Sequence, residues 1–171
     1  MQLKTWILIG MMGAGKSTIG RELAVRSGRS FRDTDQMIQS RFGRSVARVF
    51  DLYGEAAFRE HETSLLESLH PAKEVLATGG GIVLREENWV EMRRLGTTVY
   101  LDVEPEVLKQ RLSKSKKPRP LLMVDQWESR FDALYAARQE LYRKADLCVA
   151  LGLDTPHETV TKLLLALGFE E

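Results

Sequence analysis

The sequence predicts an α/β fold in which one parallel β-sheet is covered by helices on both faces. Short apolar segments, partly β-branched, alternate along the chain with longer segments of helical periodicity. This alternation is typical of parallel sheets, because each parallel strand needs a crossover connection that a helix usually provides. A length of 171 residues with 43% hydrophobic side chains is enough for one ordinary core. We therefore expect a single three-layer α/β/α domain over residues 1–171.

The predicted strands and helices follow each other closely along the chain. The first strand, 5–9, is followed directly by a glycine-rich turn and then by a helical pattern from 16 to 27. The other strands are predicted at 31–33, 74–78, 97–101 and 147–150. Further helices are predicted at 56–69, 86–95, 104–112, 126–144 and 158–167.

The glycine-rich turn, which begins at Gly10, matches the P-loop pattern of a glycine, four residues and then Gly-Lys-Ser. In this motif backbone N–H groups point at phosphate oxygens, and the following helix adds the positive end of its dipole. Lys16 is placed to reach the β- and γ-phosphates, Ser17 to ligate Mg²⁺ and Thr18 to add a phosphate contact. The motif predicts a P-loop NTPase fold that binds a nucleoside triphosphate. The residues expected to hold the nucleotide here are Gly13, Ala14, Gly15, Lys16, Ser17 and Thr18.

The P-loop alone leaves open GTPase switches, sensors, ATPases and small-molecule kinases. The sequence has no Asn-Lys-x-Asp element of the kind that reads guanine, which disfavours a switch GTPase. The 25 Lys plus Arg residues are balanced by 24 Asp plus Glu residues, so the basic excess needed for binding nucleic acid is missing. We expect no nucleic acid partner.

Several features favour a cytoplasmic protein. Segment 5–9 is too short for a signal peptide, and no small-residue cleavage site follows it. No later apolar run approaches the roughly 20 residues that a membrane span requires. Cys148 is the only cysteine, so neither an internal disulfide nor a thiolate metal cluster can form, which suits a reducing cytosol. We expect its thiol to be buried.

A pair of acids follows the second strand, at the edge of the sheet where ligands of open α/β folds bind. In Asp33-Thr34-Asp35, one carboxylate can support Mg²⁺ through water while the other accepts a hydrogen bond from an attacking hydroxyl. The alternative is that Asp35 caps the helix that starts near Gln36.

The candidate acceptor site includes arginines on two predicted helices. Arg59 and Arg138 would each be an ordinary surface residue if taken alone. Together with the triplet 79–81, which can expose backbone N–H groups, they can form a forked clamp for a carboxylate. With Asp35 holding hydroxyls, this pattern describes a polyhydroxylated carboxylic acid as the substrate.

The basic, proline-bearing segment at about 113–124 lies between two predicted helices. A solvated charge run is one interpretation. A mobile lid is the better one in an enzyme that must exclude water from phosphoryl transfer. Arg119 in this lid could then move onto the transferring phosphate and stabilise its charge in the transition state.

Taken together, these motifs resemble one family, the shikimate kinases. The matching segments cover essentially the whole chain, in the family's order and at its length. The resemblance implies ATP-dependent phosphorylation of the 3-hydroxyl of shikimate, a step towards chorismate and the aromatic amino acids. It also implies a monomer with a five-stranded parallel sheet. The matching segments are 10–17, 31–35, 54–62, 77–81, 119–122 and 138–142.

The resemblance also assigns roles to single residues. It makes Asp35 the base, although a loose transition state leaves a base little to do until late. It places Arg111 beside the adenine, Asp33 near Mg²⁺, and Phe50 and Phe58 as an apolar wall beside the ring, where they can also pack in the core. The residues implied to hold shikimate are Asp35, Arg59, Gly79, Gly80, Gly81 and Arg138, and the acceptor-binding helical region spans about 34–62.

Departures from the family pattern occur in two loops. Loop 152–156 lacks the arginine that some members place against the adenine, so adenine selectivity stays open. Lys117 and Pro118 make the lid stiffer and more basic, because proline restricts both itself and the residue before it. We expect this to change the lid rate and not the chemistry.

Two other functions stay open at this point. A kinase for gluconate, also a polyol acid, is disfavoured by the acid pair, the glycine triplet and the lid. A nucleotide-binding protein without catalysis is disfavoured because one chain contains the whole set of candidate residues, namely Lys16, Asp35, Arg59, Arg119 and Arg138.

Overall fold

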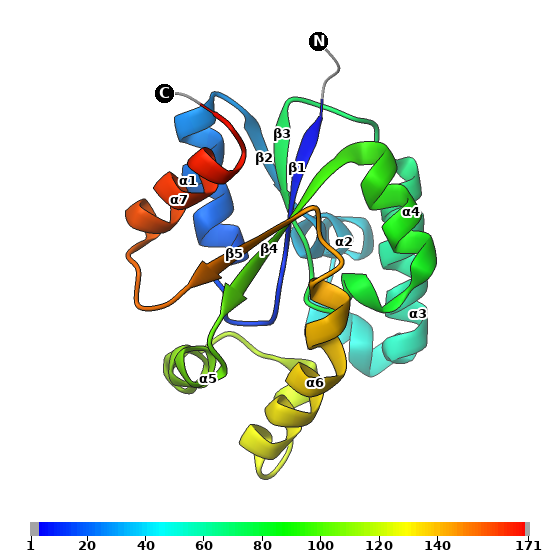
Figure 1. Ribbon diagram of the computed structural model, residues 1–171. Helices are drawn as coiled ribbons and strands as arrows, with labels where there is room; N and C mark the ends of the chain where they lie inside the picture. Colours follow the sequence, from blue (N-terminus) through cyan, green and yellow to red (C-terminus); the bar gives the residue numbers. More distant parts are fainter. Residues whose placement is uncertain (1–3, 170–171) are drawn as a thin grey trace.

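The computed structural model describes residues 4–169 as an α/β domain around one sheet (Figure 1). All neighbouring strands of this five-stranded sheet run parallel, in the order β2-β3-β1-β4-β5. The predicted fold class and parallel sheet are therefore confirmed. Residues 1–3 and 170–171, which the predicted domain includes, lie outside the described residues.

The elements follow the predicted alternation of strand and helix. The strands are β1 (Thr5–Ile9), β2 (Ser30–Asp33), β3 (Glu74–Ala77), β4 (Gly96–Val103) and β5 (Leu147–Leu151). The helices are α1 (Lys16–Ser27), α2 (Thr34–Phe42), α3 (Val46–Ser68), α4 (Glu86–Leu95), α5 (Pro105–Lys114), α6 (Trp127–Tyr142) and α7 (Pro156–Ala166), with short 3₁₀ helices at Ile82–Leu84 and Pro120–Leu122.

Strand β1 lies at the centre of the sheet, and all its residues are buried. Its register is fixed from both sides, with Ile7 opposite Leu76 of β3 and opposite Thr98 of β4. A strand covered on both faces needs a continuous apolar run, which the sequence supplies up to Ile9. The glycine-rich turn that follows therefore emerges from the middle of the sheet at its carboxyl end.

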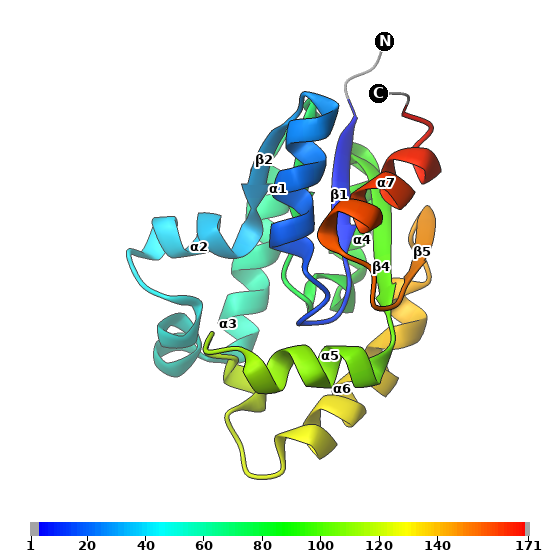
Figure 2. The ribbon, with the colours of Figure 1, turned by 90° about the vertical axis from the view of Figure 1, so that its left-hand side faces the viewer.

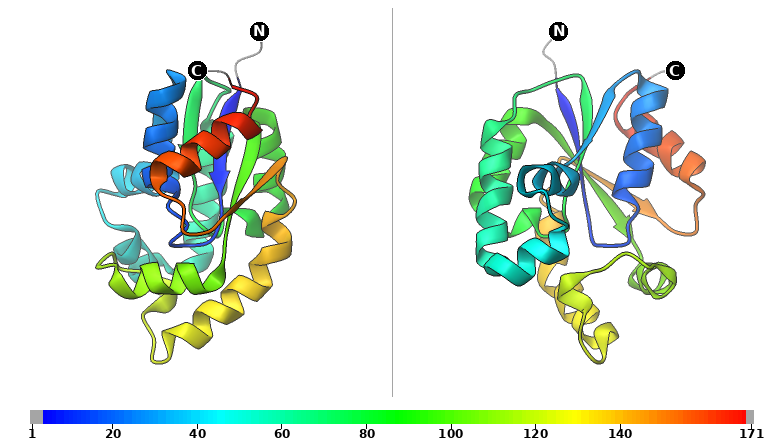
Figure 3. Two further views of the ribbon diagram at one scale, coloured as in Figure 1. Left: turned by 60° about the vertical axis from the view of Figure 1, so that its left-hand side comes forward. Right: turned by 180° about the vertical axis from the view of Figure 1, so that it is seen from behind.

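Helices cover both faces of the sheet. Helices α1 and α7 pack side by side on one face, and α3 and α4 lie on the other (Figures 1 and 3). Helices α2 and α5 lie near the carboxyl ends of the strands, together with the P-loop and the segment between α5 and α6 (Figure 2). This edge of the sheet thus gathers all the segments that the sequence singled out for chemistry.

The helix predictions were incomplete in the acceptor-binding region. A helix starting near Gln36 entered only as the alternative role of Asp35, and α2 lies there, while α3 begins at Val46 instead of near residue 56. Residues 51–56 are exposed, and Gly54 interrupts the helical backbone at φ 83° and ψ 171°, so apolar periodicity is weak there. The other predicted elements are present, with ends shifted by a few residues at most.

The prediction for Cys148 was wrong, because the residue is exposed. Strand β5 is an edge strand in which Leu147 and Val149 face inward while Cys148 and Ala150 face solvent. Within residues 4–169, no helix combines the length and apolar character needed to cross a membrane.

Candidate active site

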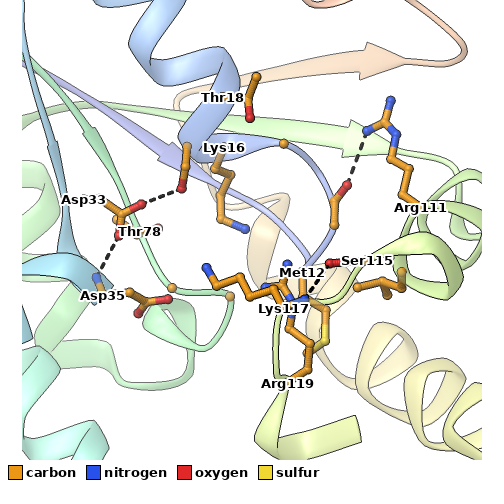
Figure 4. A pocket seen from close by; sticks show the side chains of 16 residues that line it. Met12, Lys16, Thr18, Asp33, Asp35, Thr78, Arg111, Ser115, Lys117 and Arg119 are labelled. Atoms are coloured by element: carbon orange, nitrogen blue, oxygen red, sulfur yellow. Dashed lines mark hydrogen bonds between the residues drawn. The ribbon is translucent and has the colours of Figure 1, made fainter. Parts of the chain in front are cut away.

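The candidate site consists of adjoining cavities at the carboxyl end of the sheet. A phosphate cavity of about 330 Å³ is bounded by the P-loop, the start of α2, the glycine triplet and the lid segment (Figure 4). An acceptor cavity of about 80 Å³ shares Met12, Asp35 and Arg119 with it. A third cavity, of about 280 Å³, adjoins the phosphate cavity and shares Gly13 and Arg111 with it. We call it the base cavity, after the nucleotide base.

The P-loop is held by its own backbone and by the lysine that follows it. Ala14 N–H donates to the Met11 carbonyl at 3.1 Å. Lys16 begins α1, and its Nζ donates back to the carbonyls of Gly10 at 2.7 Å and Met11 at 3.0 Å. The ammonium therefore crosses the loop and lies in the phosphate cavity, as phosphate binding by Lys16 requires.

Asp33 links the P-loop helix to α2. Its Oδ2 accepts from the Ser17 hydroxyl at 2.5 Å, and its Oδ1 accepts from the backbone N–H groups of Asp35 at 2.9 Å and Gln36 at 3.3 Å. Asp33, and not Asp35, is thus the N-cap of α2. Because its backbone is held by this cap, Asp35 directs its carboxylate into the cavity (Figure 4).

The pair of Ser17 and Asp33 fits Mg²⁺ by its chemistry. Both offer oxygen atoms, the ligands that this hard cation prefers. Among residues 4–169, no group of three or more His, Cys, Asp or Glu side chains could enclose a metal ion.

The charges in the phosphate cavity perturb one another. Burial, followed by repulsion from Arg119, lowers the pKa of Lys16 to about 7. Burial also lowers the pKa of Arg119. The pKa of Asp35 is raised, first by burial and then by the nearby Asp33 carboxylate. Such shifts are common at sites that bind and transfer charged groups.

Lys117 was not predicted as a site residue, yet it lines the phosphate cavity with Arg119. Its ammonium is directed towards Lys16 and Asp35 (Figure 4), and its charge acts on the pKa values of both. The chain bends at Lys117, whereas Arg119 has extended φ and ψ of −125° and 95°. No local sequence pattern therefore indicated that Lys117 faces the cavity.

In the acceptor cavity, Arg59 is buried and oriented by acids of its own helix. Its Nη1 donates to Glu62 Oε2 at 2.7 Å and its Nη2 to Glu55 Oε1 at 3.3 Å. The guanidinium lies directly over Gly81, where a Cβ would come within 2.3 Å of its Cζ. Only glycine at this position leaves room for the arginine.

Arg138 faces the same cavity from α6 and is also buried. Its Nη1 would lie 3.5 Å from a Cβ built on Gly80. Phe50 and Phe58, whose ring centroids are 4.6 Å apart, form the apolar side of the cavity. The cavity therefore combines two buried guanidinium groups, backbone of the glycine triplet and an aromatic wall.

Glu62 is a further buried acid that the sequence analysis did not select. Its side chain is fully buried, and burial raises its pKa although the Arg59 charge opposes this. A Cβ on Gly79 would lie 2.8 Å from Glu62 Oε1 and 3.0 Å from Asp35 Oδ1. The i,i+3 spacing from Arg59 was the available signal.

The base cavity lies where α5 meets the last loop. Arg111 Nη1 donates to the Gly13 carbonyl at 3.3 Å, which holds the arginine along the P-loop. Asp154, opposite, accepts from Gly152 N–H at 3.0 Å and pairs with Lys162 at 2.6 Å. The cavity therefore offers an arginine, an ion-paired aspartate and Pro156 to a flat ring.

The structure brings all the predicted site residues into these cavities, while their roles stay predictions. Residues of the phosphate cavity are Gly13, Gly15, Lys16, Ser17, Thr18, Asp33, Asp35, Gly79, Gly80, Arg111 and Arg119. The acceptor cavity adds Arg59, Gly81 and Arg138, and the base cavity adds Ala14.

Comparisons with known proteins agree with this geometry. The family model described as shikimate kinase matches residues 12–167. A shikimate kinase of Aromatoleum aromaticum is 44% identical over 152 residues, which are 88% of this chain and 86% of that one. Another, of Chromohalobacter salexigens, is 44% identical over 164 residues, 95% of this chain and 91% of that one.

A solved structure gives the same result. Shikimate kinase from Acinetobacter baumannii in complex with shikimate superposes with a TM-score of 0.90 at 36% identity, covering 97% of this chain and 94% of that one. This chain belongs to the shikimate kinase family.

Proposed function

We propose that the protein transfers the γ-phosphate of ATP to the 3-hydroxyl of shikimate, with Lys16, Asp35 and Arg119 acting on the reacting groups. One observation carries the assignment of residues. Asp35 lines both the phosphate cavity and the acceptor cavity, so its carboxylate lies where a bound hydroxyl and a bound phosphate would meet.

The acceptor is held from the side away from the phosphates. Arg59 and Arg138 bind the shikimate carboxylate, because two buried guanidinium groups favour a charged, forked partner over a neutral one. Backbone of the triplet 79–81 and the wall of Phe50 and Phe58 complete the pocket. Asp35 accepts a hydrogen bond from the attacking hydroxyl and so aligns it with the γ-phosphate.

The phosphates are held by P-loop N–H groups and Lys16, with Arg111 beside the adenine. Ser17 and Asp33 would hold Mg²⁺. When bound, this ion would neutralise part of the phosphate charge. Lys16 and Arg119 stabilise the charge that develops on the transferring group. Asp35 takes the hydroxyl proton late in the transfer, and its raised pKa suits that role.

The lid, at about 113–124, closes over the phosphates, and the helical region at about 34–62 binds the acceptor, within one domain. The enzyme acts as a monomer in this proposal, as the resemblance to the family implies. The balanced net charge of +1 gives no support to a nucleic acid partner. We place the enzyme in the cytoplasm, which its single cysteine also suits.

The decisive experiment measures ADP release from ATP by the purified protein, with and without Mg²⁺. Shikimate and gluconate are tested as separate acceptors beside a sample without acceptor. We expect release with shikimate and Mg²⁺ only. Release with gluconate, or release without any acceptor, would overturn the assignment and favour the corresponding alternative.

A further inference from the structure

Tyr142, at the end of α6, lies at a junction between parts of the site without lining any of the cavities. The residue is fully buried. Its hydroxyl donates to the Gly80 carbonyl at 2.6 Å and lies 3.8 Å from the Met11 sulfur in the P-loop. The glycine triplet and the P-loop therefore meet at this hydroxyl.

The same hydroxyl also lies beside the acceptor clamp. Arg138, one helical turn earlier on α6, has its Nη1 3.5 Å from a Cβ built on Gly80, the residue whose carbonyl the hydroxyl binds. The Arg138 charge acts on the hydroxyl, and since arginine can only donate, the phenolic oxygen is the atom that can accept from it. Burial raises the pKa of Tyr142 to about 12, so the phenol keeps the proton it donates to Gly80. The ring is held by stacking on Tyr100, with centroids 5.1 Å apart and planes 19° apart.

The hydrogen bond to the Gly80 carbonyl also orients the N–H group of Gly81, a residue of the acceptor cavity. The carbonyl of Gly80 and the N–H of Gly81 belong to one planar peptide unit and point in opposite directions. Holding the carbonyl on Tyr142 therefore orients the Gly81 N–H away from it, and Gly81 lines the acceptor cavity.

We infer that Tyr142 is a positioning residue for the acceptor: its hydroxyl holds the Arg138 guanidinium and the Gly80–Gly81 peptide in the one arrangement that fits a carboxylate. This inference rests on the proposed function. A planar guanidinium loses its forked contact when it rotates, so a fixed partner on its inner side preserves affinity for the acid.

The test compares Tyr142→Phe with Tyr100→Phe. Both variants lose one phenolic hydroxyl from the same stacked pair, but Tyr100 lies on β4, outside the cavities. In Tyr142→Phe we expect the KM for shikimate to rise about tenfold, because the charged Arg138 and the Gly80 carbonyl both lose the hydroxyl that holds them. The KM for ATP stays within about twofold, since the P-loop keeps its own hydrogen bonds. Tyr100→Phe leaves both KM values unchanged.

A double variant locates the effect. In an Arg138→Ala background, Tyr142→Phe adds only about threefold to the KM for shikimate, since one of the two groups it positions is already gone. Melting temperatures of all variants are recorded beside the kinetics.

An unchanged KM for shikimate in Tyr142→Phe would overturn the inference. So would an equal rise in the KM for ATP, which would indicate a general structural role. If wild-type protein showed no shikimate-dependent turnover, the proposed function would fail and this inference with it. Normal wild-type turnover with an unaffected Tyr142→Phe would remove the inference alone.

Discussion

The phosphate and acceptor ends of the site are built in different ways. The phosphate end is organised around one contiguous stretch, the P-loop and the first residues of α1, which follows directly from the central strand β1. The acceptor end joins side chains from α2, α3 and α6 around the glycine triplet. The first end depends on local backbone, whereas the second depends on how distant helices pack. We therefore expect substitutions at the two ends to have separable effects.

The largest effect is expected at Asp35, which belongs to both ends. Asp35→Asn keeps the shape but loses the charge that aligns and deprotonates the hydroxyl, so kcat falls by about 100-fold or more. The dissociation constant of ATP, measured by calorimetry, stays nearly unchanged. Asp51→Asn, at an exposed acid on α3, is the matched control. Normal turnover in Asp35→Asn would remove the role assigned to this residue.

The next effect tests the packing of the acceptor end. Gly81→Ala introduces a Cβ within 2.3 Å of Arg59, which ion pairs with Glu62 and Glu55 hold in place. Arg59 is displaced, and the KM for shikimate rises about tenfold or more, while the KM for ATP does not change. In Gly152→Ala the new methyl group meets nothing within 4 Å, so kinetics like wild type are expected. A parallel rise in both KM values would show that the ends are not separable.

A smaller effect is expected at the lid side of the phosphate end. Lys117→Ala removes a cation that lines the phosphate cavity but is exposed, so kcat/KM for ATP falls only about threefold. Lys116→Ala removes a neighbouring exposed charge outside the cavity and serves as the control. Equal losses in the two variants would mean that general charge, and not position, is responsible.

The smallest effect is a change of protonation at Lys16. Its pKa is lowered to about 7, and phosphate oxygens would raise it again. At pH 8 the free enzyme holds Lys16 mostly neutral, so ATP binding takes up nearly one proton, whereas at pH 6 the group is already charged. Calorimetric titrations in buffers of different ionisation enthalpy measure this uptake. Absence of uptake at pH 8 would contradict the environment described for Lys16.

The same contrast explains what could be predicted from the sequence. The P-loop and β1 are encoded locally, by a glycine pattern and by a continuous apolar run, and were predicted correctly. Helix α2 is short, with only Thr34 and Ile38 fully buried, so its apolar periodicity was too weak to detect. In the first part of α3, residues 51–56 are exposed and Gly54 interrupts the helix, which has the same effect.

The partners of the acceptor residues could be predicted only in part, because their burial arises only on packing. The spacing of Glu62 from Arg59 allows an ion pair, but the burial of Glu62 is a tertiary property. Tyr142 bonds a carbonyl far away in the sequence, at Gly80. Lys117 was assigned only to lid stiffness because nothing local shows that its side chain points inward.

The position of Cys148 has a consequence for the reactivity of its thiol towards oxidants. The thiol is exposed on the edge strand, yet its pKa is raised, first by partial desolvation and then by the Asp102 carboxylate. Sulfur reacts with peroxides and electrophiles mainly as the thiolate, which is scarce here near neutral pH. The single cysteine of the chain is therefore exposed to solvent but slow to react, and peroxide should oxidise this thiol only slowly near neutral pH.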